Sequence, residues 1–487
     1  MNKFSVKEKD ELLKPYYSDK KTKIIALIVF SVLILASAIL IIVLNATNSN
    51  DPIQEELLPG FIEPNSIIAT YIIEDPSKTI LLFNNSYSDL IHTLKIDENK
   101  VNITNEYQFD SQGEHTIKIY FKKPLKSMNN FFAKCEDLIE VNFMNLTSEK
   151  LRTTVNMFNG CEKLSHVNFT NFDASSLNNI SNMFNGCTSL NSIDFEGFSD
   201  NELQDMSGLF SNCTNLTTIN LYSFNSRNVI NMSNAFYECK NLEEIELSHL
   251  YTGNVLDMSN MFYGCSSLYL INQDFDTSKV IYMNGMFQGC KNLTNFTLEN
   301  FETESVEDMN LMFSDCELIT QLNLSNFNTQ NVTNMSGMFQ NCISLENVNL
   351  SYFNVKNVKD MGYMFNNCTS LNEIYLDNIN PYNLVYMPAM FQNCISLPSI
   401  NFSTINDDNI TTIDNVEDMN YLFNGCSSLT YIKFNCFNTS SIHSYEYIFN
   451  GLPENGIFVY DSKIFDNKLF DTLPSKWVKT DIPNETS

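Results

Sequence analysis

The sequence predicts an α/β solenoid, in which stacked repeats carry a parallel β-sheet on one face and short helical turns on the other. Three observations lead to this prediction: evenly spaced cysteines, a short alternating apolar segment after each cysteine, and a segment of helical spacing before it. Such even spacing of one residue type is expected when each repeat places the same residue at the same core position between its two neighbours.

The cysteines set the period of the repeat. Neighbours in the series are 26 residues apart, except for one step of 25 and a last step of 32, and Cys436 stands outside it. Even spacing does not fit zinc, whose ligands come in close pairs such as Cys-x-x-Cys. We expect buried free thiols, and disulfides between neighbouring repeats are the alternative. The series consists of Cys135, Cys161, Cys187, Cys213, Cys239, Cys265, Cys290, Cys316, Cys342, Cys368, Cys394 and Cys426.

Apolar residues recur at fixed distances from each cysteine. A methionine usually stands seven residues before it and a phenylalanine three before, as in Met128 and Phe132, and spacings of three and four predict a helical turn. Leucine or isoleucine follows three residues after it, valine or isoleucine six after and phenylalanine or leucine eight after. The period of two between the last two positions predicts one short strand per repeat. The methionine and phenylalanine positions are interpreted as core, because thioethers and rings fill irregular interior gaps.

The full pattern of the repeat is Asn-Val-x-x-Met-Ser-x-Met-Phe-x-x-Cys-x-x-Leu-x-x-Ile-x-Leu-x-x-Phe. It resembles the BspA-like leucine-rich-repeat family, in the variety with 25 or 26 residues per repeat, over about twelve repeats in residues 128–452. Residues 453–487 resemble the segment that closes such arrays, and they are predicted to be a C-terminal cap and tail. The resemblance implies a leucine-rich-repeat solenoid at a cell surface, with adhesion or partner binding as its role.

Residues 24–44 are predicted to be a transmembrane signal-anchor helix. They form an apolar run without a charge, long enough at helical rise to cross roughly 30 Å of hydrocarbon. A cleaved secretory signal is the alternative, but residues 1–23 form a longer polar lead than such signals have. This lead is rich in lysine, which places it in the cytosol by the positive-inside rule. We therefore expect a single-pass type II protein of the plasma membrane with extracellular repeats.

The cytosolic tail contains Glu8, Leu12 and Leu13 in an arrangement that resembles an acidic dileucine endocytic signal. Adaptor proteins at the tail are the partners that this resemblance implies, and a solvated charged tail is the alternative.

Two segments separate the membrane span from the repeats. Residues 45–65 are polar and contain three prolines, which predicts a stalk. Residues 66–127 show alternating apolar residues and a turn signal, which predicts a small β-rich N-terminal cap. Such a cap would cover the open edge of the first repeat.

Charge and motifs limit the classes of function. A net charge of -28 argues against nucleic acid and against anionic membrane surfaces as partners. The sequence shows no nucleophile elbow, phosphate loop, metal-ligand spacing or isolated carboxylate pair. We therefore expect a protein that is not an enzyme and that has no cofactor and no metal.

The residues that face outward from the predicted strands are polar and rich in asparagine. This asparagine column is either a structural ladder of amides or part of a binding face. Tyr375, Tyr431 and Lys433 depart from it, and aromatic residues are enriched in interface cores, so these three are the candidate partner contacts.

Asn-x-Ser and Asn-x-Thr triplets are abundant, and they make N-glycosylation a further expectation, although an Asn- and Ser-rich chain also produces them by chance. The candidate sites are Asn45, Asn84, Asn102, Asn145, Asn168, Asn179, Asn212, Asn231, Asn292, Asn323, Asn334, Asn349, Asn367, Asn401 and Asn438.

Together these features predict a membrane-anchored surface protein that binds a protein, cell-surface or matrix ligand. A glycosylated structural coat protein without a dedicated ligand is the alternative.

Overall fold

The computed structural model describes residues 65–482, apart from 147–150, 171, 196–201, 223, 273–274, 295–296, 299, 377–380 and 403–411. The described residues belong to one compact unit. The predicted cytosolic tail, the predicted membrane span and residues 45–64 of the predicted stalk lie outside them. Within the described part of the chain, no helix is long and apolar enough to cross a membrane.

An antiparallel sheet precedes the repeats. Strand β1 (Ser66–Ile73) lies between β6 (Gly113–Phe121) and β7 (Leu138–Asn145), while β3 (Ile91–Ile96) and β4 (Asn99–Val101) extend the sheet beyond β6. Because β7 belongs to the first repeat and also pairs in parallel with β8 (His166–Asn168), β1 covers the edge that the first repeat would expose. A separate two-stranded antiparallel sheet of β2 (Thr79–Leu81) and β5 (Glu106–Gln108) and the 3-10 helix η1 (Asn85–Leu90) complete this region.

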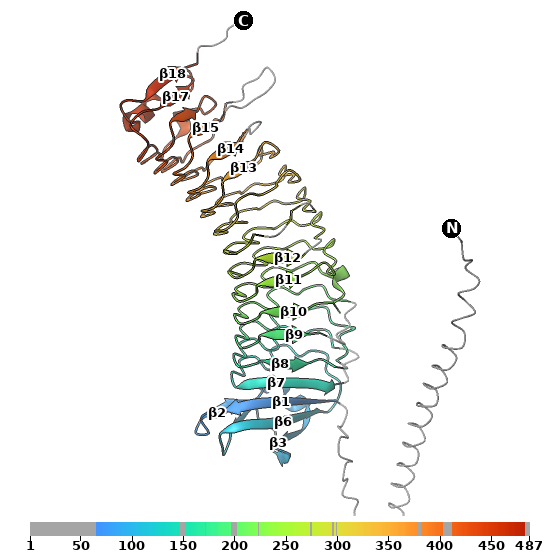
Figure 1. Ribbon diagram of the computed structural model, residues 1–487. Helices are drawn as coiled ribbons and strands as arrows, with labels where there is room; N and C mark the ends of the chain where they lie inside the picture. Colours follow the sequence, from blue (N-terminus) through green and yellow to red (C-terminus); the bar gives the residue numbers. More distant parts are fainter. Residues whose placement is uncertain are drawn as a thin grey trace, which may run out of the picture. The chain divides into compact units, whose positions relative to one another are not determined.

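Short parallel strands form one side of the repeats, which we call the strand side. Each has three residues, of which the middle one points into the core, as Ile193 does in β9. After β8 the strands are β9 (Ser192–Asp194), β10 (Thr218–Asn220), β11 (Glu244–Glu246), β12 (Leu270–Asn272), β13 (Asn347–Asn349), β14 (Glu373–Tyr375), β15 (Ser399–Asn401) and β16 (Tyr431–Lys433). The pairs β9–β10, β11–β12, β13–β14 and β15–β16 are parallel and in register, and Figure 1 shows the strands following one another along the stack.

The other side of each repeat, the turn side, is not helical, so the predicted helical turn is wrong. In the first repeat, the N–H groups of Phe131 and Cys135 donate to the carbonyls of Met128 and Phe132, which makes a run of tight turns. Two residues of this run, Asn130 and Lys134, have φ of 58° and 64°. A left-handed residue cannot continue a right-handed helix, so the run breaks after every turn.

The backbone groups that a helix would have used internally bond to the next repeat instead. The N–H groups of Asn130, Phe132 and Lys134 donate to carbonyls of the second repeat at 2.9, 2.8 and 2.7 Å. The same pattern recurs along the stack, for example from Gly289 N to Ser314 O at 2.8 Å. Some N–H groups of the run therefore bond within their own turn, and the N–H groups between them bond to the next repeat. In this way these buried backbone donors have hydrogen-bond acceptors.

This geometry explains the residue that stands directly before each cysteine. That position is left-handed in every repeat, and glycine and asparagine adopt this conformation at the lowest cost. Gly289 has φ 75°, and a Cβ at this position would lie 3.3 Å from Gly264 Cα. Glycine here therefore provides both the backbone angle and the close approach of two repeats.

A second ladder runs along the start of the turn side. Single residues eight positions before each cysteine of the series pair in parallel from repeat to repeat, from Ser127 to Asp418, and Ser444 of the last repeat continues the ladder. Most are Asp or Asn, whose side chain accepts a bond from the backbone two residues later, as Asp205 Oδ1 does from Ser207 N at 2.9 Å. This local turn explains why Asp or Asn precedes the recurrent methionine.

The core between the two sides contains an aromatic stack. Neighbouring rings of the phenylalanine column lie 5.3–6.1 Å apart at interplanar angles of 3–15°. The column consists of Phe132, Phe158, Phe184, Phe210, Phe236, Phe262, Phe287, Phe313, Phe339, Phe365, Phe391, Phe423 and Phe449. All of these rings are buried, which confirms the prediction that the phenylalanine positions are core.

The cysteines lie beside this stack as buried free thiols, which confirms the favoured prediction over the disulfides. From Cys161 to Cys426, each thiol of the series donates to the carbonyl of the stacked phenylalanine in the preceding repeat, as Cys161 Sγ does to Phe132 O at 3.0 Å. Burial raises the pKa of these thiols, to about 12 for Cys135 and Cys426. The cysteine column is therefore a packing element.

Two further strands close the C-terminal end. Strands β17 (Ile457–Tyr460) and β18 (Val478–Asp481) add in parallel to β16, and Trp477 Nε1 donates to Pro453 O at 2.8 Å. The 3-10 helix η4 (Asn467–Thr472) lies between these two strands in the sequence, and η2 (Ser226–Asn228) and η3 (Thr439–Ser441) lie within the repeats. The described residues thus form a repeat protein of short strands and turns with few helices.

Candidate partner-binding surface

The strand side presents polar side chains to solvent. In β9 and β15 both outer residues are exposed, while the middle residue is buried. The outward positions expected from the sequence are therefore the ones that face solvent.

The three candidate contact residues lie on this side but on two different sheets. Tyr431 and Lys433 share one face of β16 and are partly exposed. Tyr375 ends β14, which pairs with β13, and its side chain is 40% exposed. A hydrogen bond with Glu373 is the main cause that raises the pKa of Tyr375. The structure thus brings two of the candidates together and places the third two repeats away.

The strand-side asparagines mainly stabilise turns. The side chains of Asn168, Asn323 and Asn349 accept bonds from the backbone N–H two residues later, at 2.8–3.2 Å. Asn220 does the same and also donates to Asp194 in the preceding repeat at 3.1 Å. These contacts favour a structural role for the asparagine column.

A true ladder of amides occurs on the turn side, immediately before the cysteines. Asn341, Asn367 and Asn393 donate in turn to Asp315, Asn341 and Asn367 at 2.7, 2.8 and 2.7 Å. All of these residues are left-handed. The ladder is therefore a consequence of the backbone geometry that selects asparagine at this position.

The candidate glycosylation sites fall into classes with different access. Asn179, Asn212, Asn367 and Asn438 already use their amide nitrogen in hydrogen bonds to other side chains. Asn84, Asn168, Asn231 and Asn334 are partly exposed, and their amide oxygen accepts a local backbone bond. Asn102, Asn292, Asn323, Asn349 and Asn401 are exposed. Asn45 and the side chain of Asn145 are not described.

Local turn chemistry accounts for many of these triplets. In Asn231-Met232-Ser233, the asparagine side chain accepts from both the N–H and the hydroxyl of the serine, and the methionine between them is fully buried. The same arrangement places Asn-x-Ser where a repeat needs a turn. The abundance of the triplets therefore has a structural origin.

The endocytic signal proposed for Glu8, Leu12 and Leu13 lies outside the described residues.

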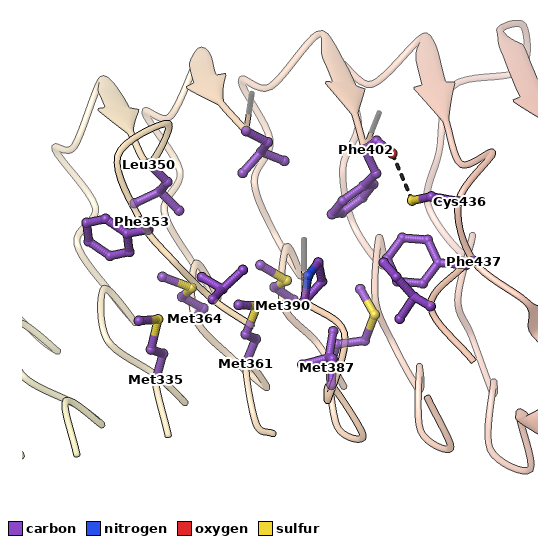
Figure 2. A pocket seen from close by; sticks show the side chains of 15 residues that line it. Met335, Leu350, Phe353, Met361, Met364, Met387, Met390, Phe402, Cys436 and Phe437 are labelled. Atoms are coloured by element: carbon purple, nitrogen blue, oxygen red, sulfur yellow. Dashed lines mark hydrogen bonds between the residues drawn. The ribbon is translucent and has the colours of Figure 1, made fainter. Parts of the chain in front are cut away.

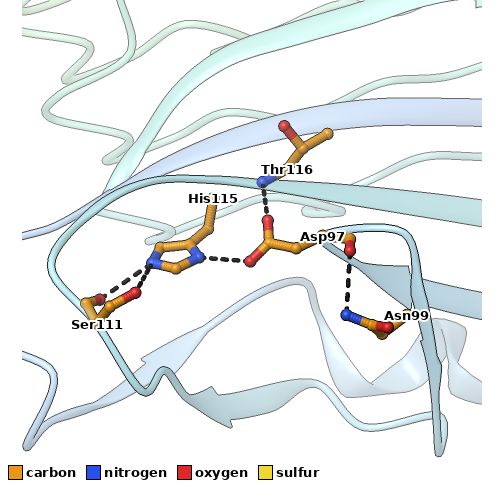
Figure 3. Close-up of polar contacts among 5 residues, drawn as sticks. All are labelled: Asp97, Asn99, Ser111, His115 and Thr116. Carbon is orange, nitrogen blue, oxygen red and sulfur yellow. Dashed lines mark hydrogen bonds and ion pairs between the residues drawn. The ribbon is translucent and has the colours of Figure 1, made fainter.

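One cluster in the N-terminal sheet has the composition of a catalytic triad (Figure 3). His115 Nδ1 lies 2.6 Å from Asp97 Oδ2, and His115 Nε2 lies 3.4 Å from Ser111 Oγ. However, Nε2 is closer to the backbone carbonyl of Ser111, at 3.0 Å. A nitrogen that faces a carbonyl has to donate, so it is not free to take a proton from the serine. The cluster has a structural role: His115 of β6 connects Asp97, in the turn after β3, to the backbone of Ser111.

An apolar cavity inside the later described repeats is too small for a ligand. Side chains of the strand and turn sides, including Met335, Met361 and Phe402, line this cavity of about 20 Å³ (Figure 2). This volume is close to that of a single water molecule, and an apolar wall does not retain one. Among the residues that the structure describes, no group of three His, Cys, Asp or Glu is arranged to hold a metal ion.

The sequence reasoning missed a set of exposed tyrosines on the turn side. Tyr363, Tyr421 and Tyr447 are 46%, 37% and 55% exposed, and they occupy a left-handed position with φ of 60°, 59° and 56°. The signal was present in the sequence: five residues before the cysteine, the early repeats mostly have Asn or Gly, whereas Tyr363 and Tyr421 stand there in two of the last repeats, with Ala389 between them. Tyr447 occupies the equivalent position five residues before Leu452. Only the φ angles reveal that this change has an energetic cost, of order 1–3 kcal/mol for each strained residue.

Comparison with known proteins identifies one matching family. The profile described as "Mycoplasma protein of unknown function, DUF285" matches four overlapping stretches, residues 126–249, 230–322, 317–414 and 399–466. A search of curated proteins found no match.

Solved structures give weak similarities. A chain in the crystal structure of the TLR13-ssRNA13 complex is 15% identical, with a TM-score of 0.24, over 74% of this chain and half of that one. The functional domain of InlJ from Listeria monocytogenes, described as including a cysteine ladder, is 9% identical, with a TM-score of 0.18, over 66% of this chain and 68% of that one.

Proposed function

Because the chain belongs to the family described as Mycoplasma protein of unknown function, DUF285, we propose that its repeats form a leucine-rich-repeat solenoid of the BspA-like kind that serves in binding or adhesion at a cell surface. The observation that carries this proposal is the contrast within each strand. The buried residues are nearly the same in every repeat, whereas the outward residues vary, from Ser192 and Asp194 to Tyr431 and Lys433. Packing constrains the interior positions, and the variable exposed positions are free to recognise a partner.

The proposal includes a membrane anchor. The apolar run at residues 24–44 would hold the chain in the plasma membrane, with the lysine-rich tail and its dileucine in the cytosol and the repeats outside. An epitope placed after Ser487 tests this topology. Labelling of intact cells is expected, and labelling only after permeabilisation would contradict it.

We propose a binding role and no catalysis. The described side chains that most resemble a catalytic group, Asp97, His115 and Ser111, are committed to structural hydrogen bonds. The exposed strand side is a broad polar face, which suits a macromolecule better than a metabolite.

Capture by the strand side tests this role. Ectodomain beads would be incubated with surface-labelled cells, using the unchanged chain and a variant with Tyr375→Ala, Tyr431→Ala and Lys433→Glu. Loss of capture by the variant is expected, while a matched variant at exposed Tyr222 and Tyr352 should capture normally. Equal capture by all three proteins would reject these contacts.

The alternative is a glycosylated coat protein without a dedicated ligand. Exposed Asn323, Asn349 and Asn401 favour it, because sugars on them would cover part of the strand side. A glycosidase shift with site mapping decides between the two. Occupied strand-side sites together with failed capture would favour the coat.

A further inference from the structure

The turn side of the last repeats carries a row of exposed aromatic rings, which we call the tyrosine surface. It consists of Tyr363, Tyr386, Tyr421 and Tyr447, whose side chains are 46%, 47%, 37% and 55% exposed. Each comes from a different one of four successive repeats.

Backbone contacts place these residues next to one another. Tyr363 N donates to Pro388 O at 2.8 Å, two residues from Tyr386 in the sequence. Tyr386 pairs in parallel with a residue of each neighbouring repeat, Asp360 and Asp418. The rings of Tyr421 and Tyr447 stack with centroids 5.2 Å apart at 15°. The four tyrosines therefore come from adjoining repeats of the turn side, and the rings of Tyr421 and Tyr447 are in contact. In the repeat of Tyr386 the left-handed position itself is Ala389, with φ of 52°.

Stability does not explain tyrosine at these positions. Tyr363, Tyr421 and Tyr447 have φ of 60°, 59° and 56°, a region that bulky residues rarely adopt. In earlier repeats the same left-handed position is mostly occupied by the residues that tolerate it. These are Asn130, Asn156, Asn182, Asn234 and Asn260, and Gly208, Gly285 and Gly337. Strain that is retained at exposed rings points to a use for the rings.

Charge indicates what the tyrosine surface would bind. The segments 359–363, 385–389, 417–421 and 443–447 contain four carboxylates, Asp360, Glu417, Asp418 and Glu446, against one ammonium group, Lys359. None of these four carboxylates forms an ion pair with a described residue. Burial, together with the charge of Asp418, raises the pKa of Asp360. A cation between these carboxylates would relieve their repulsion.

We propose that the tyrosine surface binds a basic peptide segment of a partner protein, with Arg and Lys side chains over the tyrosine rings and beside Asp360 and Asp418. Ring faces attract guanidinium and ammonium groups, and carboxylates form charge-assisted hydrogen bonds with them. The net charge of -28 would raise the encounter rate with such a segment. The inference rests on the proposed binding role. It adds a peptide-binding surface on the turn side, whereas the candidate contacts Tyr375, Tyr431 and Lys433 lie on the strand side.

The test measures binding of a fluorescein-labelled peptide of alternating Arg and Gly to the full-length chain by anisotropy. Saturable binding is expected, and the variant with Tyr363→Asn, Tyr421→Asn and Tyr447→Asn should bind at least about tenfold more weakly. This variant keeps the net charge, and asparagine already occupies the same left-handed position in early repeats. Its melting temperature should therefore stay the same or rise.

Two further variants complete the test. Asp360→Asn with Asp418→Asn should also weaken binding, because asparagine keeps the local turn and removes the charge. Tyr222→Asn with Tyr352→Asn, at residues 62% and 61% exposed elsewhere, should bind like the unchanged chain. The proposal is overturned if all three variants bind alike, or if the corresponding Glu-Gly peptide binds as tightly. Peptide binding through the tyrosines together with failed capture of cells would reject the surface role and leave this inference standing.

Discussion

The two sides of each repeat are joined to their neighbours in different ways. On the strand side, pairing is interrupted: β9 pairs with β10, β11 with β12 and β13 with β14, each as a separate small sheet. In the described residues no strand is assigned between β12 and β13. On the turn side, the ladder that begins at Ser127 reaches Ser444 without a break.

This difference indicates where the stack gains its cohesion. Hydrogen bonds between turns, the phenylalanine stack and the thiol contacts all recur on or next to the turn side. Repeat proteins depend on the interface between neighbouring units, so the buried residues of the turn side have to stay nearly constant. The strand side can vary because it contributes less to that interface.

Thiol alkylation gives the largest expected contrast, since it tests whether the turn side stays closed. A pKa of about 12 for Cys135 and Cys426, against the ordinary 9.0, leaves about a thousandth of the usual thiolate. We expect iodoacetamide to label the native chain about a thousandfold more slowly than the chain in guanidinium, by mass spectrometry. Because the folded state favours the neutral thiol, stability should fall as the pH rises above 9.0. Rapid labelling of native thiols would contradict a closed turn side.

Removal of one stacked ring should give the largest loss of stability. Phe313 is fully buried between Phe287 and Phe339, with ring centroids 5.6 and 5.8 Å away. Phe313→Ala is expected to cost about 3–5 kcal/mol of unfolding free energy, measured by urea denaturation. Thr218→Ala, at an exposed strand-side position, serves as the control and should change it by less than about 0.5 kcal/mol. Similar losses for both would remove the distinction between the two sides.

A side chain at a left-handed turn-side glycine should have a smaller effect. Gly289→Val places a branched side chain at φ 75°, against the backbone of Gly264, and is expected to cost about 2 kcal/mol. Gly253→Ala is the matched control, since its new Cβ would meet only the ends of the Tyr251 and Asp276 side chains. A chain that tolerates both changes equally would show that the turns adjust freely.

The smallest expected effect concerns a single charge on the turn side. Burial, then repulsion from Asp418, raises the pKa of Asp360 above the ordinary 3.8. The folded state therefore holds the proton more tightly, and the contribution of this group to stability falls as the pH rises from 3.8 through the raised pKa. Asp360→Asn removes this dependence, and Asn334 in the preceding repeat shows that asparagine accepts the same local bond. The urea midpoint at neutral pH should be equal or higher in the variant, and a clear drop would contradict this.

The repeat pattern predicted the interior correctly but not the conformation of the turn side. Phe132, Cys135 and Val141 are buried at the expected places, because burial depends on composition and spacing that recur in every repeat. The helical turn was wrong because spacings of three and four bring side chains to one face in a helix and also in a run of turns that includes left-handed residues. Four expectations stay predictions: the membrane anchor, the endocytic signal, the glycosylation, and the contact roles of Tyr375, Tyr431 and Lys433.

The sequence by itself determined the period, the core columns and the outward positions of the strands. The same positions are buried in every repeat, so comparing the repeats within the sequence is enough to identify them. Only the tertiary structure decided that the turn-side N–H groups bond to the next repeat, as Phe132 N does to Met157 O at 2.8 Å. The spacing of apolar side chains does not indicate which backbone groups bond to each other when they belong to different repeats. The same reason explains why the left-handed strain of Tyr363, Tyr421 and Tyr447 became apparent only once the repeats were stacked.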